Sequence, residues 1–285
     1  THALLPRQPH PPARLSAFRS RGNPMSDLLL AASAVTRRFG GLTAVNGVSL
    51  GLARGQVHAV IGTNGAGKST LINILSGELA PTSGQVMLGG RDVTAWRQPE
   101  RARAGLGRSY QRSTLFPELT VFENCRLAAQ AGRQRFWHWW RPASDCRRSA
   151  DLAQHALERT GLADDAARVA GLLPHGRKRQ LEIAMCLAGE PQVLLLDEPL
   201  AGMGPEETDR ILDLLHTLKT GHAILLVEHD MDAVFRIAET ITVMVNGTAI
   251  ASGTPTQIRA NAEVRTAYLG EDTQDNAKET PPCTH

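Results

Sequence analysis

The chain has 285 residues, of which 42% are hydrophobic and 21% are charged, as in an ordinary globular protein with a sizeable core. It carries 31 basic and 28 acidic side chains, and this near balance, a net charge of +3, argues against a protein that binds nucleic acid or coats a membrane surface. The four cysteines form neither a C-x-x-C pair nor a Cys/His cluster with zinc spacing, which indicates reduced thiols rather than a metal site.

The two ends of the chain differ in composition from the rest. Residues 1–24 contain four arginines, five prolines and no acidic residue, which predicts a disordered basic extension rather than a secretion signal. Met25 follows directly, and we expect it to be the true start of the protein. Residues 271–285 are polar and predict a flexible tail. The globular domain is therefore expected over residues 27–270. Its apolar runs are too short to span a bilayer, so any membrane role needs a separate membrane-embedded partner.

In the first half of the chain, hydrophobic patterning predicts strands followed by helices. Residues 28–61 predict short strands, the last of them buried, and a helix is expected over 68–76. A turn over 81–84 leads into a strand over 85–88. Helical composition then marks residues 120–131 and 147–160, and apolar side chains at i, i+3, i+4 and i+7 mark a further helix after Gly176.

The last third of the chain alternates between buried strands and helices. The continuous apolar run from Val193 to Leu196 predicts a strand covered on both faces. Pro205 and the two glutamates after it favour the start of a helix, and strands are expected over 223–228 and 241–245. Together these elements predict an α/β fold with a mostly parallel sheet and flanking helices.

The strongest motif is a run of eight residues that fits G-x-x-x-x-G-K-[ST] between a predicted strand and a predicted helix. Backbone N–H groups of such a loop curl around phosphate oxygens, and the positive N-terminus of the helix adds to the attraction. Lys68 is expected to reach the β- and γ-phosphates, and Ser69 to offer its hydroxyl to Mg²⁺. A plain glycine-rich turn is the alternative, whereas a dinucleotide loop would need G-x-G-x-x-G. The residues expected to bind ATP here are Gly62, Thr63, Asn64, Gly65, Ala66, Gly67, Lys68, Ser69 and Thr70.

Two acidic residues, Asp197 and Glu198, directly follow the strand that begins at Val193. Ligands of parallel α/β sheets bind at the carboxyl ends of the strands, so both acids are expected near the phosphate loop. There Asp197 would hold Mg²⁺, and Glu198 would orient or deprotonate the attacking water. Taken alone, such a pair could instead cap a helix. His229 follows the next strand and is a candidate γ-phosphate sensor, although a lone histidine is commonly an ordinary surface or core residue.

In chain order these motifs resemble the ATP-binding subunits of ABC transporters over roughly residues 28–270. The resemblance implies a P-loop NTPase core, an antiparallel β subdomain, and an α-helical subdomain inserted at about residues 112–190. Gln111 resembles the loop glutamine that contacts Mg²⁺ and the attacking water, His229 the switch histidine, and Phe39 the aromatic that stacks on adenine. The implied catalytic residues are Glu198, His229, Gln111 and Lys68, and the implied Mg²⁺ residues are Ser69, Gln111 and Asp197.

Within that family, three stretches are similar to the ATPases of branched-chain amino acid importers: residues 115–121, 201–206 and 267–271. The resemblance implies membrane-embedded permease subunits, a second ATPase subunit in a homo- or heterodimer, and indirectly a periplasmic substrate-binding protein. It also implies a peripheral position at the cytoplasmic face of the inner membrane, and no nucleic acid. The aromatic stretch 136–140 would be either a docking surface or ordinary packing.

Other functions share much of this chemistry. An ABC exporter or a lipid-extraction system would carry the same catalytic residues. A soluble ATP switch commonly joins two ATPase cassettes or carries long coiled coils, and here there is one phosphate loop and no sustained heptad pattern.

The signature loop departs from the family pattern. Where the family has Leu-Ser-Gly-Gly-Gln, this chain has Leu173, Pro174, His175, Gly176 and Arg177. Proline offers neither a hydroxyl nor an N–H, and Arg177 places a permanent cation where the family has a neutral amide. Gly176 and the expected helix start would still favour an anion. A non-hydrolysing scaffold is the alternative that this loop favours. With a different ATPase partner, we expect the site that uses Lys68, Glu198 and His229 to hydrolyse well and the site that uses this signature loop to be weaker.

Overall fold

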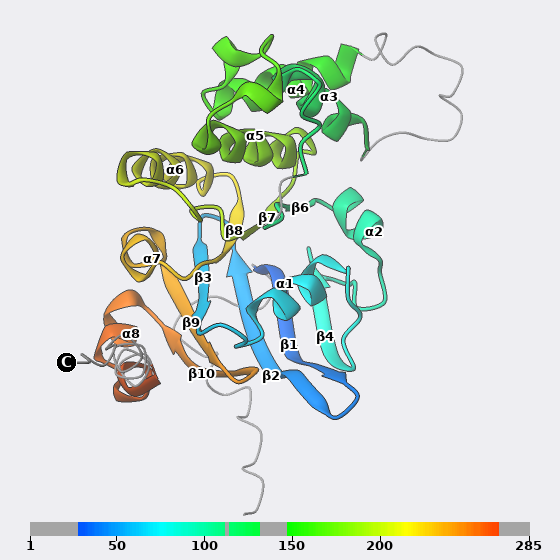
Figure 1. The fold of residues 1–285 in the computed structure, drawn as a ribbon. Helices are drawn as coiled ribbons and strands as arrows, with labels where there is room; N and C mark the ends of the chain where they lie inside the picture. The colour runs from blue at the N-terminus through cyan, green and yellow to red at the C-terminus, as the bar shows by residue number, and fades with distance from the viewer. Residues whose placement is uncertain (1–27, 112–113, 132–146, 268–285) are drawn as a thin grey trace, which may run out of the picture.

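The computed structural model describes residues 28–111, 114–131 and 147–267 (Figure 1). The expected basic extension over 1–24, the tail over 271–285 and the aromatic stretch 136–140 lie outside the described residues. No helix in the described part of the chain is long and apolar enough to cross a bilayer.

A six-stranded sheet in the order β10-β9-β3-β8-β7-β6 forms the centre of the molecule. The five strands from β9 to β6 are parallel, and β10 pairs antiparallel with β9. Their bounds are β3 (Val57–Gly62), β6 (Leu106–Arg108), β7 (Val193–Asp197), β8 (Ala223–Val227), β9 (Thr240–Val245) and β10 (Thr248–Gly253). Every residue of β3, β7 and β8 is buried, as expected for strands covered on both faces.

A second, antiparallel sheet in the order β2-β1-β4-β5 packs beside the first. Its strands are β1 (Leu28–Phe39), β2 (Leu42–Ala53), β4 (Ser83–Leu88) and β5 (Arg91–Asp92). The expectation of short strands at the start of the chain is wrong for β1 and β2, which have 12 residues each. The β1–β2 pairing shifts register at several points, one of them around Ala34, whose φ is +48°. Such bulges interrupt the apolar–polar alternation, so one long strand has the sequence pattern of several short ones.

Helices flank the central sheet, and three of them form a separate layer at the top of Figure 1. The flanking helices are α1 (Lys68–Ser76), α2 (Gln98–Arg103), α6 (Pro205–Leu218), α7 (Met231–Ile237) and α8 (Pro255–Ala260). The separate helical layer contains α3 (Val121–Ala131), α4 (Arg147–Arg159) and α5 (His175–Ala188), with the 3₁₀ turns η5 (Ala163–Asp165) and η6 (Ala170–Leu172). The predicted helices over 68–76, 120–131 and 147–160 match α1, α3 and α4 to within one residue at each end.

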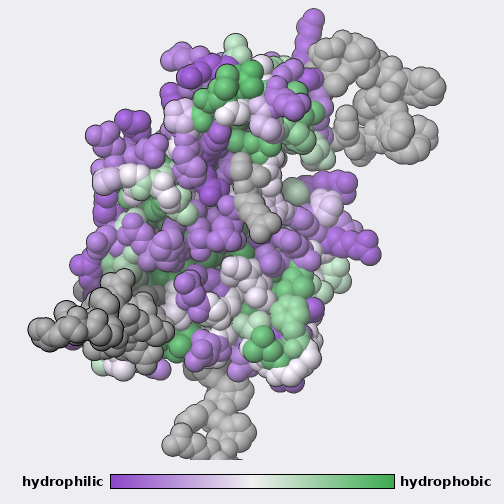
Figure 2. All heavy atoms as spheres, viewed as in Figure 1, coloured by the Kyte–Doolittle hydropathy of each residue, from purple (hydrophilic) through white to green (hydrophobic). Residues whose placement is uncertain are grey.

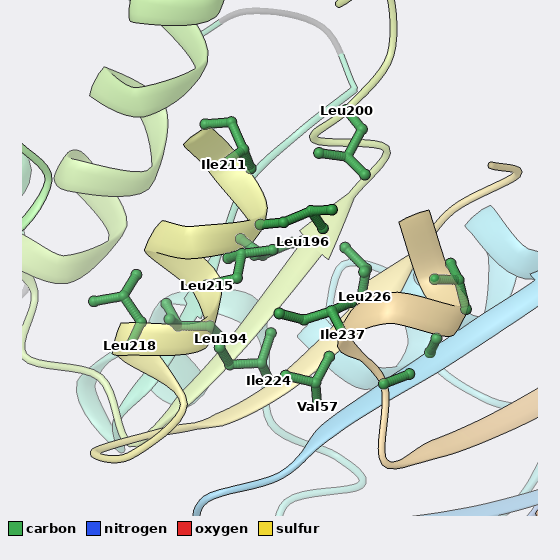
Figure 3. Packing of buried hydrophobic residues seen from close by; sticks show 14 of the residues in the cluster. Val57, Leu194, Leu196, Leu200, Ile211, Leu215, Leu218, Ile224, Leu226 and Ile237 are labelled. Atoms are coloured by element: carbon green, nitrogen blue, oxygen red, sulfur yellow. The ribbon is translucent and has the colours of Figure 1, made fainter. Parts of the chain in front are cut away.

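Two apolar clusters cover the two faces of the central sheet, and a third fills the helical layer. On one face, Leu194 and Leu196 of β7 pack with Ile211 and Leu215 of α6 (Figure 3). On the other face, residues of the same strands pack with α1 and with the antiparallel sheet. Figure 2 shows a largely hydrophilic surface over the middle of the molecule and apolar residues gathered on the helical layer above it. Because the sheet is fixed from both faces, the carboxyl ends of its strands form a rigid platform.

Candidate functional site

The phosphate loop lies between β3 and α1, and its glycines are required by close backbone contacts. A Cβ on Gly62 would lie 2.3 Å from the carbonyl oxygen of Met244. Gly67 has a φ of +95°, and a Cβ there would lie 2.3 Å from the carbonyl oxygen of Ala44. Gly67 is also the N-cap of α1, whose first-turn N–H groups have no intrahelical partner. The loop therefore presents a helix N-terminus that favours an anion.

Lys68 folds its side chain back onto this loop. Its Nζ donates hydrogen bonds to the carbonyl oxygens of Gly62 (2.6 Å) and Thr63 (3.1 Å). Burial lowers the pKa of the amine, while the nearby carboxylates of Glu198 and Asp197 oppose that shift. The carbonyls of Gly62 and Thr63 thus hold a cation at the mouth of the loop, where a polyphosphate would meet it.

Asp197 ends β7 next to the phosphate loop and is almost fully buried. Burial raises the pKa of its carboxyl, and the nearby guanidinium of Arg108 acts in the opposite direction. The Asp197 Oδ2 lies 3.9 Å from Nη2 of Arg108. The Nη1 of the same guanidinium donates to Ser76, the last residue of α1, and to Glu78 just beyond it. Arg108 was not identified from the sequence, and it links the carboxylate to the end of the helix that the phosphate loop begins.

Glu198 and Gln111 meet across the site. Gln111 Nε2 donates to Glu198 Oε2 at 2.8 Å. Glu198 has a φ of +48°, a left-handed conformation that is uncommon for a glutamate. Its backbone N–H donates to the carbonyl of Val227 at 2.9 Å, so the neighbouring strand holds this conformation in place. Backbone strain of this kind clusters at functional sites.

Lys68, Gln111 and Glu198 line one pocket of about 560 Å³, within the range of small-molecule sites. The pocket wall contains residues that were predicted from the sequence and others that were not. It consists of Phe39, Leu42, Thr43, Ala44, residues 64–70, Gln111, Glu198, Asn246 and Gly247. Of the residues expected at the site, Gly62, Thr63, Asp197 and His229 are not in the wall. The first two act through their carbonyls on Lys68, and Asp197 is buried at the end of β7.

His229 lies away from the pocket wall with 62% of its side chain exposed. Its Nδ1 is 3.8 Å from Oε2 of Glu228, which is fully buried. Glu228 also accepts a hydrogen bond from the backbone N–H of Leu200 at 2.8 Å. Burial raises the pKa of the Glu228 carboxyl, and the hydrogen bonds from the backbone N–H groups of Leu200 and His229 oppose that shift. Glu228 therefore fixes the backbone around His229 to the loop that follows Glu198.

Five lining residues that the sequence did not reveal come from the start of β2 and from the β9–β10 turn: Leu42, Thr43, Ala44, Asn246 and Gly247. Asn246 and Gly247 form that turn, with φ values of +47° and +79°. Gly247 donates to the carbonyl of Ala66 in the phosphate loop at 3.0 Å and accepts from the N–H of Asn46 at 2.8 Å. The Asn-Gly pair between two strands is a hairpin signal, but sequence alone does not show which loop the hairpin contacts.

The exposed ring of Phe39 forms part of the pocket wall and has the guanidinium of Arg37 over it. The Cζ atom of Arg37 lies 4.6 Å from the ring centroid, and its Nη1 donates to the carbonyl of Ala80 at 2.8 Å. A cation on one ring face leaves the other available for stacking.

The altered signature loop begins α5, with Pro174 at the N-cap rather than inside the first turn. The N–H of Gly176 donates to Oε1 of Glu207 at 3.3 Å. A carboxylate of the same chain thus lies at the helix start that we expected to favour an anion. Arg177 points away from this start, with its Nη2 3.0 Å from Oδ2 of Asp165 and its Nη1 donating to the carbonyl of Gly161.

The oxygen ligands in the pocket wall and at the adjacent end of β7 suit a hard cation that is shared with a phosphate ligand. Ser69, Gln111 and Asp197 offer hydroxyl, amide and carboxylate oxygens, the ligand types of Mg²⁺. Among the described residues, no group of three or more histidine, cysteine, aspartate or glutamate side chains could hold a metal by itself.

Comparison with known proteins identifies the family. The family model for ABC transporters matches residues 45–201. The chain belongs to the ABC transporter family. A second model, for the branched-chain amino acid ATP-binding cassette transporter, matches residues 250–273. Membership of the ABC family makes the chain a nucleotide-binding ATP hydrolase with a P-loop NTPase fold.

Curated relatives align along nearly the whole ABC domain. The high-affinity branched-chain amino acid transport ATP-binding protein BraF of Pseudomonas aeruginosa is 42% identical over 257 residues, which are 87% of this chain and 100% of the relative. LivG of Escherichia coli, with the same description, is 41% identical over the same shares.

Among solved ABC structures, the ADP conformation of the cassette MJ1267 matches with a TM-score of 0.77 and 30% identity over 85% of this chain and 99% of that one. A nucleotide-free ATP-binding cassette matches with a TM-score of 0.76 and 29% identity, over 85% and 98%.

Proposed function

We propose that this ATPase powers an importer of branched-chain amino acids or related small amides. The observation that carries the proposal is the pocket that joins the phosphate loop to the Gln111–Glu198 pair. The substrate class is supported by relatives that are named for branched-chain amino acid transport and match their full length. An exporter would need the same pocket, but the relatives at 41–42% identity are named for branched-chain amino acid transport, and this does not favour export.

In this proposal the phosphate loop binds the triphosphate of ATP. Residues 62–70 surround the phosphates with N–H groups, and Lys68 exchanges a loop carbonyl for the β- and γ-phosphate oxygens. Ser69, Gln111 and Asp197 would hold Mg²⁺, which when bound neutralises the charge that develops on the phosphates. Phe39 stacks on the adenine with the ring face that Arg37 leaves open.

The hydrolytic step depends on the carboxylate of Glu198. Its Oε2 accepts from Gln111, so the carboxylate has a fixed orientation from which it can accept a proton from water or align it. His229 senses the γ-phosphate, with Glu228 as the buried group that positions its backbone.

The proposal extends to the organisation of the chain and its assembly. Residues 27–270 form one ABC ATPase domain with the helical subdomain inserted at about residues 112–190. The protein is peripheral, at the cytoplasmic face of the inner membrane, on membrane-embedded permease subunits. It pairs with a second ATPase subunit, and a periplasmic substrate-binding protein delivers the substrate to the permeases.

The test is reconstitution of the co-purified membrane complex in proteoliposomes with its substrate-binding protein and radiolabelled leucine. We expect uptake that depends on ATP, ATP hydrolysis that loaded binding protein stimulates, and loss of both with Lys68→Ala. Hydrolysis without uptake of any branched-chain amino acid or small amide contradicts the substrate class. Absence of hydrolysis in the intact complex contradicts the proposed activity itself.

A further inference from the structure

Arg179 on α5 reaches from the helical layer to the backbone of the loop that follows β6. Its Nη1 donates to the carbonyl of Tyr110 at 3.3 Å and its Nη2 to the carbonyl of Gln111 at 3.2 Å. On its own helix, Nη1 also contacts Oε2 of Glu182 at 2.8 Å. The side chains of Arg179 and Glu182 are 11% and 5% exposed, so water competes little for their ion pair, whereas the bond from Nη2 to the Gln111 carbonyl is exposed.

The loop that Arg179 contacts contains Gln111, whose side chain forms a hydrogen bond with Glu198. Gln111 uses its side-chain amide for Glu198 at 2.8 Å and its backbone carbonyl for Arg179. One residue therefore separates the guanidinium from Glu198. A displacement of the Gln111 backbone carries the side-chain amide with it, so the hydrogen bond to Glu198 is kept only if the three side-chain torsions of Gln111 readjust.

The shape of the side chain matters for this contact. A guanidinium is a planar fork whose two terminal nitrogens can serve two neighbouring carbonyls, whereas a lysine ammonium is a single point of charge. The bond of Nη1 to buried Glu182 fixes the fork to α5. Movement of α5 relative to the sheet is thereby passed to residues 110 and 111.

We propose that Arg179 is a positioning residue that keeps the Gln111 amide on Glu198 and couples α5 to the hydrolytic site. The inference rests on the roles proposed above for Gln111 and Glu198. The same helix begins at the signature loop, where Gly176 donates to Glu207. A ligand or subunit that shifts the start of α5 acts, through Arg179, on the group that orients Glu198.

The test is a double-mutant cycle in the assembled transporter complex, with Arg179→Lys and Gln111→Ala singly and together. Loss of the fork is expected to lower kcat about tenfold with the KM for ATP changed less than twofold, since the phosphate loop is untouched. In the Gln111→Ala background, Arg179→Lys is expected to have no further effect on kcat. Additive effects of the two substitutions, or a raised KM with unchanged kcat, would overturn the proposal.

A matched control and a second variant separate coupling from folding. Arg168 also pairs with an acid three residues away, Asp165, at 2.7 Å inside the helical layer. Arg168→Ala is expected to leave kcat unchanged. If Arg179→Lys melts below the assay temperature, the neutral pair Arg179→Gln with Glu182→Gln replaces it in the cycle, with the same criterion.

The failures of the two proposals are distinguishable. If Gln111→Ala and Glu198→Gln leave turnover unchanged, the proposed function fails. If those two reduce turnover while Arg179→Lys does not depend on Gln111, the role of Arg179 alone is wrong.

Discussion

Gln111 donates its side-chain amide to Glu198 at 2.8 Å, although 87 residues separate them in the chain. We predict that Gln111→Ala lowers kcat about tenfold, because the carboxylate loses a charge-assisted hydrogen bond that orients it. The KM for ATP should change less than twofold, since phosphate and base contacts remain. Steady-state ATPase kinetics of the assembled complex check this, and an effect confined to KM would contradict it.

Glu198→Gln removes the charge but keeps a side chain of the same size. We predict that hydrolysis at this chain's site falls by about 100-fold or more while ATP still binds, since a neutral amide cannot accept the proton of the attacking water. With a different ATPase partner, the turnover that remains in the complex should be less than half. Residual turnover of half or more would mean that the site completed by Pro174 and Gly176 is not the weaker one.

Arg37 and Phe39 are predicted to contribute to recognition of the base and not of the phosphates. Phe39→Ala should weaken ATP binding about tenfold through loss of stacking, and Arg37→Ala by a smaller factor in the same direction. Inhibition by inorganic tripolyphosphate, which lacks a base, should be unchanged in both variants. Equal losses for ATP and tripolyphosphate would show that the substitutions disturb the phosphate loop instead.

We predict that buried His58 makes the free energy of unfolding depend on pH, independently of catalysis. It is buried in β3, where Nδ1 donates to the carbonyl of Gly51 and Nε2 contacts the Thr242 hydroxyl at 2.8 Å. Burial lowers its pKa from 6.5 to about 4. Between these values the unfolded chain binds the proton and the folded one does not. The stability is therefore present above pH 6.5 and is lost as the pH falls toward 4.

Urea unfolding at pH 7 and pH 5 measures this effect against His58→Gln, which cannot titrate. The wild type should lose about 2 kcal/mol more than the variant between the two pH values. Equal losses in the two proteins would show that His58 binds a proton as readily in the folded chain as in the unfolded chain.

Much of the site follows from local sequence. The glycine spacing predicts the phosphate loop because glycine alone tolerates the approach of Ala44 and Met244. The apolar run of β7 predicts where its two acids come to lie, since strand ends in a parallel sheet share one edge. By contrast, β1 continues through several bulges as one long strand, and no local sequence pattern indicates that it does so.

Contacts between distant segments could not be predicted in this way. Nothing in the sequence near Arg179 indicates that its side chain reaches the backbone of residues 110 and 111. The hydrogen bond from Gly176 to Glu207 likewise depends on how α6 lies relative to α5. The Asn246–Gly247 hairpin is locally encoded, but its contact with the phosphate loop depends on the order of the strands in the sheet.

A structure of the complex with Glu198→Gln, ATP and Mg²⁺ tests most directly whether the phosphate loop and the end of β7 bind one magnesium triphosphate. We expect a triphosphate enclosed by residues 62–70 with Lys68 on its β- and γ-phosphates, and a Mg²⁺ ion between Ser69 and the end of β7 near Gln111. A nucleotide bound elsewhere, or a triphosphate whose γ-phosphate points away from residue 198, would contradict it.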